Sequence, residues 1–203
     1  MTARQVHGTT LVDASELLSA DEHSRQATGE RSEAIAADGI VVRSAGVLAA
    51  VATADCVPIL LAADRQEGQR DRWAACVHAG WRGTLAGIAA EAVRRARADG
   101  VVPLRLHAVL GPSIGSCCYE VGKDVAVRFR EADLPVLDEG ARSRLDLRDI
   151  NRRLLESCGL APQRIRLAGP CTSCRSDRYH SYRRSSATRG RQLSWIGWEA
   201  ASP

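Results

Sequence analysis

The stretch CVHAGWRG at residues 76–83 joins an apolar run to a glycine-bounded turn, and the interpretation of the whole chain starts from it. The run WAACVHA (73–79) is almost continuously apolar, which is typical of a strand covered on both faces. It ends in His78, and two glycines follow before TLAGIAAEAVRRARADG (84–100), which is predicted as a helix. A buried strand thus brings a histidine to its end, where glycines allow the backbone to approach a bound group closely.

Similar apolar runs recur along the chain and alternate with amphipathic stretches. Strands are predicted at 38–43, 46–54, 57–64, 73–79, 104–111, 164–169 and 192–198. Helices are predicted at 84–100, 121–132 and 146–159. Because no helix separates the strands between residues 38 and 79, we expect hairpins there and a mixed sheet. We therefore predict an α+β (mixed α/β) fold, a single-domain mixed β-sheet with surrounding helices over residues 1–203, in which the polar residues 13–37 form a surface excursion.

Composition narrows the class of protein. The 203 residues are 45% hydrophobic but 4% aromatic, so alanine, valine and leucine must fill most of the core. Seven cysteines are an odd number, and the start MTARQVHG lacks an apolar leader, which together favour a reducing cytoplasm over a disulfide framework. No apolar run approaches the length that crosses a bilayer, and no nucleic-acid recognition motif is present. We predict a cytoplasmic protein with no membrane and no nucleic-acid partner.

Arginine supplies most of the positive charge behind the net charge of +4, and it gathers in RYHSYRRSSATRGR (178–191). A basic run of this kind is usually a solvated face. The planar guanidinium also suits a phosphate-binding pocket, because it can bind two oxygens at once. The sequence leaves both interpretations open.

Two other residues stand, like His78, beside a glycine or at the end of an apolar run. They are His7 in QVHG (5–8) and Cys56 in TADCVP (53–58). One cysteine and two histidines are a plausible donor set for zinc, and three protein ligands would leave the open position that catalytic sites keep. Two other interpretations remain: Cys56 and His78 as ordinary core residues, or as the nucleophile and base of a thiol hydrolase.

These segments carry a resemblance that covers nearly the whole chain. QVHG (5–8), ADCVP (54–58), HAGWRG (78–83), GPSIGSCCYEVG (111–122), CTSC (171–174) and SYRR followed by GR (181–191) occur in this order. The chain resembles the YfiH-like family, also called the multicopper polyphenol oxidase or laccase-domain family and, more recently, the purine nucleoside phosphorylase family.

The resemblance implies one zinc ion per chain bound by His7, Cys56 and His78, all of which are present. It also implies phosphorolysis of adenosine, inosine, guanosine and S-methyl-5′-thioadenosine, together with adenosine deamination. Purine nucleosides and phosphate are thus the expected small-molecule partners, and the oligomeric state stays open. The fold is expected to resemble that of cytotoxic necrotizing factor deamidases, which use a Cys–His pair. A thiol hydrolase or deamidase that uses Cys56 and His78 therefore remains an alternative. A catalytically impaired metal-binding interaction protein is the other alternative.

Further residues are candidates for catalytic or substrate-binding roles in this chemistry. Asp55, next to Cys56, is a candidate catalytic proton shuttle or a carboxylate that caps a turn. Arg82, Arg183 and Arg184 are candidate substrate-binding residues that would hold phosphate, with structural ion pairs as the alternative. The amide of Gln5 is a candidate substrate contact or a surface group.

Copper chemistry is less expected than zinc chemistry. The chain has five histidines, and two of them plus one cysteine cannot build a multinuclear copper cluster. We interpret CTSC (171–174) as packing and pocket wall rather than a second metal site, because its potential partners Cys117 and Cys118 are adjacent in sequence. Relatives in the family typically carry some tens of residues before QVHG, so the chain is expected to be short at its N-terminus.

Overall fold

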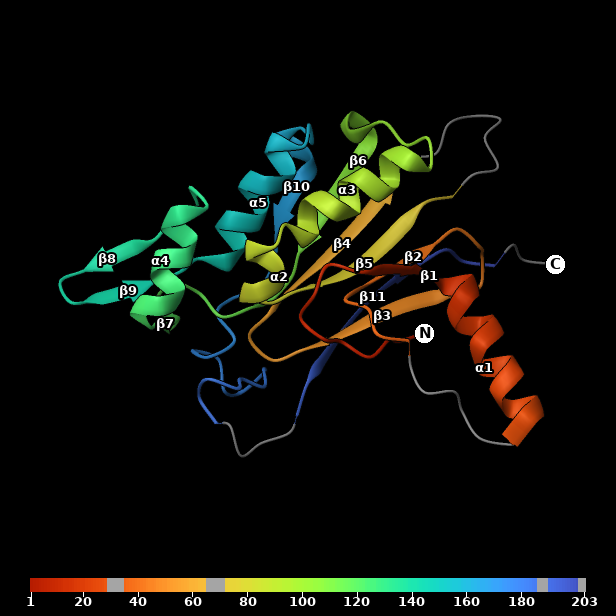
Figure 1. The fold of residues 1–203 in the computed structure, drawn as a ribbon, viewed down its shortest axis with the longest axis horizontal. Helices are drawn as coiled ribbons and strands as arrows, with labels where there is room; N and C mark the ends of the chain where they lie inside the picture. Colours follow the sequence, from red (N-terminus) through yellow and green to blue (C-terminus); the bar gives the residue numbers. More distant parts are fainter. Residues whose placement is uncertain (29–34, 65–71, 186–189, 201–203) are drawn as a thin grey trace.

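A computed structural model describes residues 1–28, 35–64, 72–185 and 190–200 of the chain (Figure 1). Its centre is a six-stranded sheet in the order β1-β2-β5-β4-β6-β10. The strands are β1 (Leu11–Asp13), β2 (Gly39–Val42), β4 (Val57–Ala63), β5 (Ala74–Ala79), β6 (Leu106–Leu110) and β10 (Ile165–Leu167). The pairs β1–β2 and β6–β10 are parallel, whereas β2–β5, β5–β4 and β4–β6 are antiparallel. The predicted α+β fold with a mixed sheet is confirmed.

Two smaller sheets and five helices complete the described chain. The first sheet pairs β3 (Leu48–Thr53) with β11 (Gln192–Gly197), and the second contains β7 (Glu120–Val121), β9 (Arg142–Arg144) and β8 (Leu137–Glu139). The helices are α1 (Ala14–Thr28), α2 (Trp81–Leu85), α3 (Ile88–Ala98), α4 (Lys123–Glu131) and α5 (Leu147–Ser157). Short 3-10 turns, η1 (Pro103–Arg105) and η2 (Pro162–Arg164), precede β6 and β10. None of the helices in these ranges is long and apolar enough to cross a bilayer.

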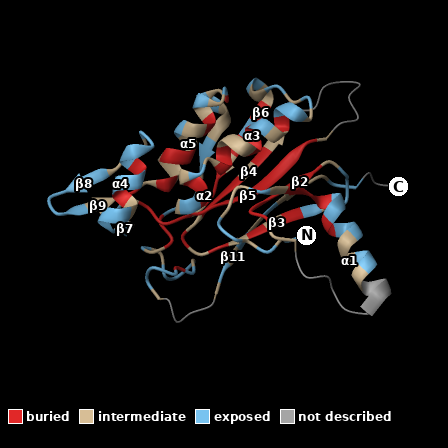
Figure 2. Ribbon diagram, in the orientation of Figure 1, coloured by how far each residue is buried: buried red, intermediate tan, exposed pale blue. Residues whose placement is uncertain are grey.

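The central strands are buried on both faces, which explains their continuous apolar runs (Figure 2). Successive side chains of a strand point to opposite faces. In β5, Ala75 and Val77 therefore join the core formed with α3 and α5, whereas Cys76 joins a second core on the β3–β11 side. In β2 the same alternation sends Val41 to the first core and Ile40 to the second. The sheet thus separates a helical layer from a two-stranded layer.

The predicted helix over 84–100 is broken into two. Gly87 adopts φ +81°, a left-handed conformation suited to glycine, and it separates α2 from α3. Thr84, predicted to start the helix, is instead fully buried inside α2, where its Oγ1 accepts a hydrogen bond of 2.9 Å from Asn151 Nδ2 of α5. The predicted helix start at Asp146 is confirmed, because its carboxylate accepts a hydrogen bond from the Asp149 amide at 3.0 Å.

Other differences concern elements with weak sequence signals. Within the predicted surface excursion, residues 14–28 form the helix α1, which was not predicted, while residues 29–34 lie outside the described part of the chain. Strands β7, β8 and β9 were not predicted, because they are two or three residues long and mostly exposed. The hairpin of β4 and β5 is confirmed. Strand β3, however, pairs with β11 from the other end of the chain rather than with a strand next to it in sequence.

The low aromatic content makes one side chain unusually important to the core. Phe129 of α4 is the single phenylalanine of the chain and is fully buried in the core shared by α3 and α5. We expect Phe129→Ala to lower the free energy of unfolding by about 3–5 kcal/mol, because it removes buried apolar surface and leaves a cavity. Val127→Ala, two residues away and 46% exposed, is the matched control and should change little. Urea unfolding followed by circular dichroism measures both variants, and equal stabilities would contradict the expectation.

Candidate functional site

A cavity of about 670 Å³ lies at the end of the central sheet where β4 begins and β5 ends. This volume suits a small organic ligand, since such pockets typically span about 300–1,000 Å³. Its polar lining consists of Gln5, His7, Asp55, Cys56, His78, Arg82, Arg183 and Arg191. Its aromatic lining consists of Trp81, Tyr119 and Tyr182. Segments from both ends of the chain therefore meet at one cavity.

Three donor side chains meet inside this lining. The ligand atoms of His7, Cys56 and His78 all lie within 4.8 Å of one another, and the two imidazole rings meet edge to face with centroids 4.8 Å apart. The sheet register explains the meeting: Val57 pairs with Ala79, so the residue before β4 and the residues at the end of β5 share one edge. One metal ion could be held by these three side chains, as their positions in the sequence indicated.

Asp38, which the sequence analysis missed, holds the two histidines of this donor set in place. Its carboxylate is fully buried and accepts hydrogen bonds from the amides of Val6, His7 and Gly8 at 3.2, 2.9 and 2.7 Å. It also lies 2.8 Å from His78 Nδ1. An ionised carboxylate can only accept, so Nδ1 carries the proton and Nε2 presents its lone pair. Asp38 stands directly before β2, and a charged residue at the start of a buried strand was the available signal.

Burial sets the protonation of the donor residues. Although burial of Asp38 acts in the opposite direction, the hydrogen bonds from His78 and from three amides hold its pKa below the usual range. Burial lowers the pKa of His78 and outweighs the opposing hydrogen bond to Asp38, which keeps the imidazole neutral. Burial, reinforced by the charge of Asp55, raises the pKa of the Cys56 thiol to about 12. At neutral pH this thiol stays protonated unless a cation stabilises the thiolate.

The two glycines of HAGWRG have a steric reason. A Cβ atom built on Gly80 would lie 2.8 Å from His7 Cδ2 and 3.1 Å from Cys56 Sγ, so a side chain here would displace two donors. A Cβ on Gly83 would lie 3.0 Å from the carbonyl oxygen of Gly8. The structure thus shows that these glycines make room for His7, Cys56 and the Gly8 carbonyl, while the expected close approach to a bound group stays a prediction.

The backbone is also strained next to the donors. Three non-glycine residues in the described ranges have positive φ, and two of them are His7 at 62° and Asp55 at 90°. Such conformations cost of order 1–3 kcal/mol for non-glycine residues and persist where surrounding contacts enforce them. For His7 those contacts are the hydrogen bonds that the backbone amides of residues 6–8 donate to the Asp38 carboxylate.

Asp55 connects the cavity to the segment 171–184. Its Oδ1 accepts a hydrogen bond from Thr172 Oγ1 at 2.7 Å, and its Oδ2 accepts from Ser181 Oγ at 3.0 Å and the Arg183 amide at 2.7 Å. Asp55 is 8% exposed. Both carboxylate oxygens are therefore engaged in holding this segment over the start of β4.

The predicted substrate-binding residues fall into two groups. Arg82 and Arg183 line the cavity, where their guanidinium carbons lie 4.4 Å from the Trp81 ring centroid and 5.3 Å from the Tyr119 ring centroid. Arg184 does not line it; its guanidinium donates to the carbonyls of Thr172, Ser173 and Tyr179. Gln5 lines the cavity, but its amide makes two hydrogen bonds with the backbone of Ala52 in β3, at 2.9 and 2.8 Å.

Sequence reasoning did not single out four of the lining residues. Trp81, Tyr119 and Tyr182 stand inside the quoted motifs, and Arg191 ends the last of them. Burial, reinforced by Cys56, raises the pKa of Tyr119 to about 12, so its phenol remains a neutral hydrogen-bond donor. Trp81 beside Arg82 in HAGWRG and Tyr182 beside Arg183 in SYRR were the signal available in the sequence.

The remaining histidines do not enlarge the donor set. His23 lies on α1, His107 lies 2.7 Å from Asp64 near the far end of β4, and the His180 amide donates to Gln192. None of these three described histidines lines the cavity. The site thus has the composition of a mononuclear centre.

Comparisons with known proteins identify relatives for this arrangement. "Purine nucleoside phosphorylase" of Deinococcus radiodurans is 41% identical over 162 residues, covering 79% of this chain and 60% of that protein. "Adenosine deaminase RL5" of an unknown prokaryotic organism is 36% identical over 165 residues, covering 78% and 61%. The crystal structure of the Bacillus licheniformis hypothetical protein YfiH has a TM-score of 0.82 at 30% identity, covering 98% of this chain and 74% of that one. The matches thus span about 60% of the length of the curated relatives.

A sequence profile described as multi-copper polyphenol oxidoreductase laccase matches residues 1–199. That match, the identities above and the YfiH fold confirm the resemblance that the motifs indicated. The chain belongs to the multi-copper polyphenol oxidoreductase laccase family and has the YfiH fold.

Proposed function

We propose that this chain is a zinc-dependent purine nucleoside phosphorylase that also deaminates adenosine. The observation that carries the proposal is the donor set His7, Cys56 and His78 in a cavity walled by arginine and aromatic side chains. The names of the two relatives above point the same way. The proposed nucleosides are adenosine, inosine, guanosine and S-methyl-5′-thioadenosine, with phosphate as the second substrate of phosphorolysis.

The residues present fit zinc. Imidazole nitrogen and thiolate sulfur are ordinary zinc ligands, and three of them leave a coordination position open. Asp38 fixes the tautomer of His78, as outer carboxylates do at zinc sites. Burial raises the pKa of the Cys56 thiol to about 12, and a metal ion bound there would stabilise the thiolate that burial disfavours. When bound, the metal would supply Lewis acidity and a more acidic water at neutral pH.

Arg82 and Arg183 are proposed to bind phosphate. Both line the cavity, and the aromatic rings beneath them restrict where each guanidinium lies. Two positive groups near one cavity favour an oxyanion that must approach the ribose C1′. Tyr182, 61% exposed on the cavity wall, offers a face on which a purine can stack.

The thiol hydrolase alternative is weaker than the zinc proposal. A nucleophilic cysteine needs a lowered pKa or a strong base nearby. Burial instead raises the pKa of Cys56 to about 12 and lowers that of His78, so thiolate and imidazolium are both disfavoured. Asp55 was predicted to be catalytic, and a proton-shuttle role there would require it to exchange one of its three hydrogen bonds.

The proposed activities separate when adenosine is incubated with the protein and the products are resolved by chromatography. Deamination should convert adenosine and water to inosine and ammonia with or without phosphate. Phosphorolysis should release adenine and ribose 1-phosphate only when phosphate is added. Absence of both products from zinc-loaded protein would contradict the proposal and favour a metal-binding interaction protein.

The metal ligands are tested by measuring zinc content by mass spectrometry. His7→Ala, Cys56→Ala and His78→Ala should each lose about one zinc ion per chain relative to the parent. Gly80→Ala should weaken binding as well, because its Cβ would push on His7 and Cys56. Gly8→Ala is the matched control, since its Cβ would make only contacts of 3.6 Å or more. Loss of activity in Cys56→Ala with zinc retained would instead support the thiol hydrolase.

The phosphate-binding role of the arginines predicts a selective defect. Arg82→Ala and Arg183→Ala should each reduce kcat/KM for phosphate about 10- to 100-fold, as expected for losing hydrogen bonds to a charged group. Adenosine deamination needs no phosphate and should change less than about threefold. Arg128→Ala is the control, because Arg128 also approaches the Trp81 ring, at 5.6 Å, but does not line the cavity. Equal losses in both reactions would contradict this assignment.

A further inference from the structure

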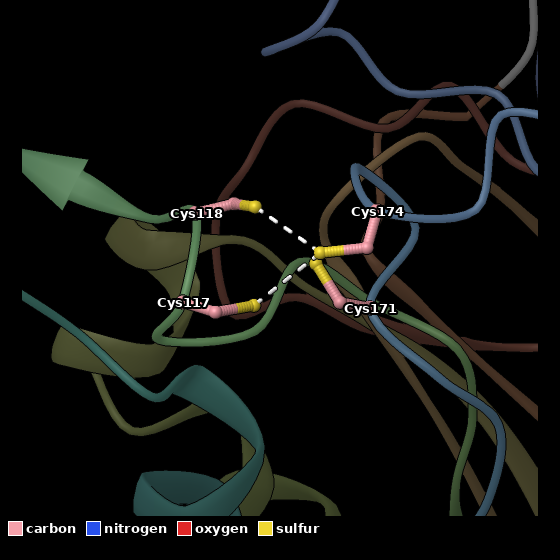
Figure 3. A group of neighbouring side chains, drawn as sticks. All are labelled: Cys117, Cys118, Cys171 and Cys174. Atoms are coloured by element: carbon pink, nitrogen blue, oxygen red, sulfur yellow. Dashed lines mark hydrogen bonds between the residues drawn. The ribbon is translucent and has the colours of Figure 1, made fainter.

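Four cysteines outside the cavity's donor set form a second cluster, here called the sulfur cluster. It consists of Cys117, Cys118, Cys171 and Cys174. The four sulfur atoms all lie within 4.8 Å of one another. Figure 3 shows the side chains of the adjacent pair pointing toward Cys174, whose sulfur is 3.6 Å from Cys117 Sγ and 3.4 Å from Cys118 Sγ. The adjacency of Cys117 and Cys118, which argued against a metal site in the sequence, therefore does not prevent both from reaching Cys174.

These separations match the size of a single metal ion. Zinc binds thiolates at about 2.3 Å in tetrahedral geometry, which places the sulfur atoms about 3.8 Å apart. The sulfur of Cys174 is 3.6 and 3.4 Å from those of Cys117 and Cys118, close to that value, and no pair among the four is more than 4.8 Å apart. A multi-iron cluster has a larger core and would hold its cysteine sulfurs further apart. A disulfide would use two of the four sulfurs and would not explain why the other two converge.

The backbone brings the two cysteine pairs together without help from a metal. Ser113 and Cys171 form a parallel bridge, and the Thr172 amide donates to the Ser113 carbonyl at 3.0 Å. The Gly115 amide donates to Cys171 Sγ at 3.2 Å. Amide donors to sulfur are a typical outer contact of metal thiolates, because they stabilise negative charge on sulfur.

A positive side chain lies against the CTSC turn. The guanidinium of Arg184 donates to the carbonyls of Thr172 and Ser173, the two residues between the cysteines of this turn, at 2.8 and 3.0 Å. Four thiolates and one divalent cation carry a net charge of −2, so a neighbouring cation is favourable. Arg184 therefore has a structural explanation beside the sulfur cluster, away from the cavity.

We propose that the sulfur cluster is a structural zinc site that is independent of the proposed catalytic site. Four protein ligands close the coordination shell, which is the arrangement of structural zinc centres. Two sulfur atoms belong to exposed residues, Cys117 and Cys174, so the ion can enter from solvent. Binding releases thiol protons and fastens residues 171–174 to the turn before Tyr119. That segment continues to Ser181 and Arg183, which hold Asp55 at the cavity.

The test counts metal in a chain from which the other donor set has been removed. The 203-residue chain carrying His7→Ala/His78→Ala, purified under reducing conditions, should retain about one zinc ion per chain by mass spectrometry. Adding Cys174→Ser should remove it. Adding Cys158→Ser instead is the matched control, because Cys158 is a half-buried cysteine directly after α5 and outside both clusters. Circular dichroism reports whether each variant is folded.

Cobalt exchange gives a second readout that needs no cysteine variant. Co²⁺ loaded into the His7→Ala/His78→Ala protein should show the intense visible absorption and sulfur charge transfer of a tetrahedral tetrathiolate. Absence of zinc from the His7→Ala/His78→Ala protein, a zinc content that Cys174→Ser leaves unchanged, iron with inorganic sulfide, or a mass lower by two hydrogen atoms from a disulfide would each overturn the proposal. None of these outcomes depends on nucleoside turnover, so they are distinguishable from failure of the proposed function.

Discussion

The buried carboxylate of Asp38 is the constraint on which the arrangement of the site depends. A charge with no exposure must be surrounded by donors, since an unpaired buried carboxylate is very costly. Asp38 finds them in three successive amides of residues 6–8 and in His78 Nδ1. The amides come from the segment before β1, and His78 comes from β5, while Asp38 itself precedes β2. Satisfying one charge therefore fixes both histidines relative to each other.

Asp55 plays the corresponding role on the other side of Cys56. Its carboxylate is satisfied by Thr172, Ser181 and the Arg183 amide, all from one late segment of the chain. Both His7, held by Asp38, and Asp55 adopt positive φ. The strain on each side is offset by several hydrogen bonds to a buried carboxylate, which is how a site can be held in shape before a ligand arrives. Gly80 lies so close to His7 and Cys56 that a side chain there would displace them.

The sequence predicted the parts of the fold that long apolar runs determine, and it failed where tertiary contacts decide. The central strands and α5 were found because burial on both faces or on one helical face produces clear periodicity. The break at Gly87 and the polar helix α1 were missed, since neither changes that periodicity strongly. The donor set was visible as His7, Cys56 and His78 beside glycine or at strand ends. Asp38 was not, because its importance comes from amides 30 to 32 positions away in the sequence.

The two donor clusters differ in how many side chains could bind a metal ion, and this difference separates their chemistry. The cavity offers three donor side chains, two imidazoles and one thiol, so a metal ion bound there would keep one coordination position open. The sulfur cluster offers four thiols and no vacancy, and its contacts lead to the backbone rather than to a cavity. Thr172 stands between them: its amide donates to Ser113 beside Cys171, and its hydroxyl donates to Asp55 beside Cys56. An ion in the sulfur cluster would therefore stabilise the segment whose Thr172, Ser181 and Arg183 hold Asp55 beside the cavity, without itself contacting the cavity.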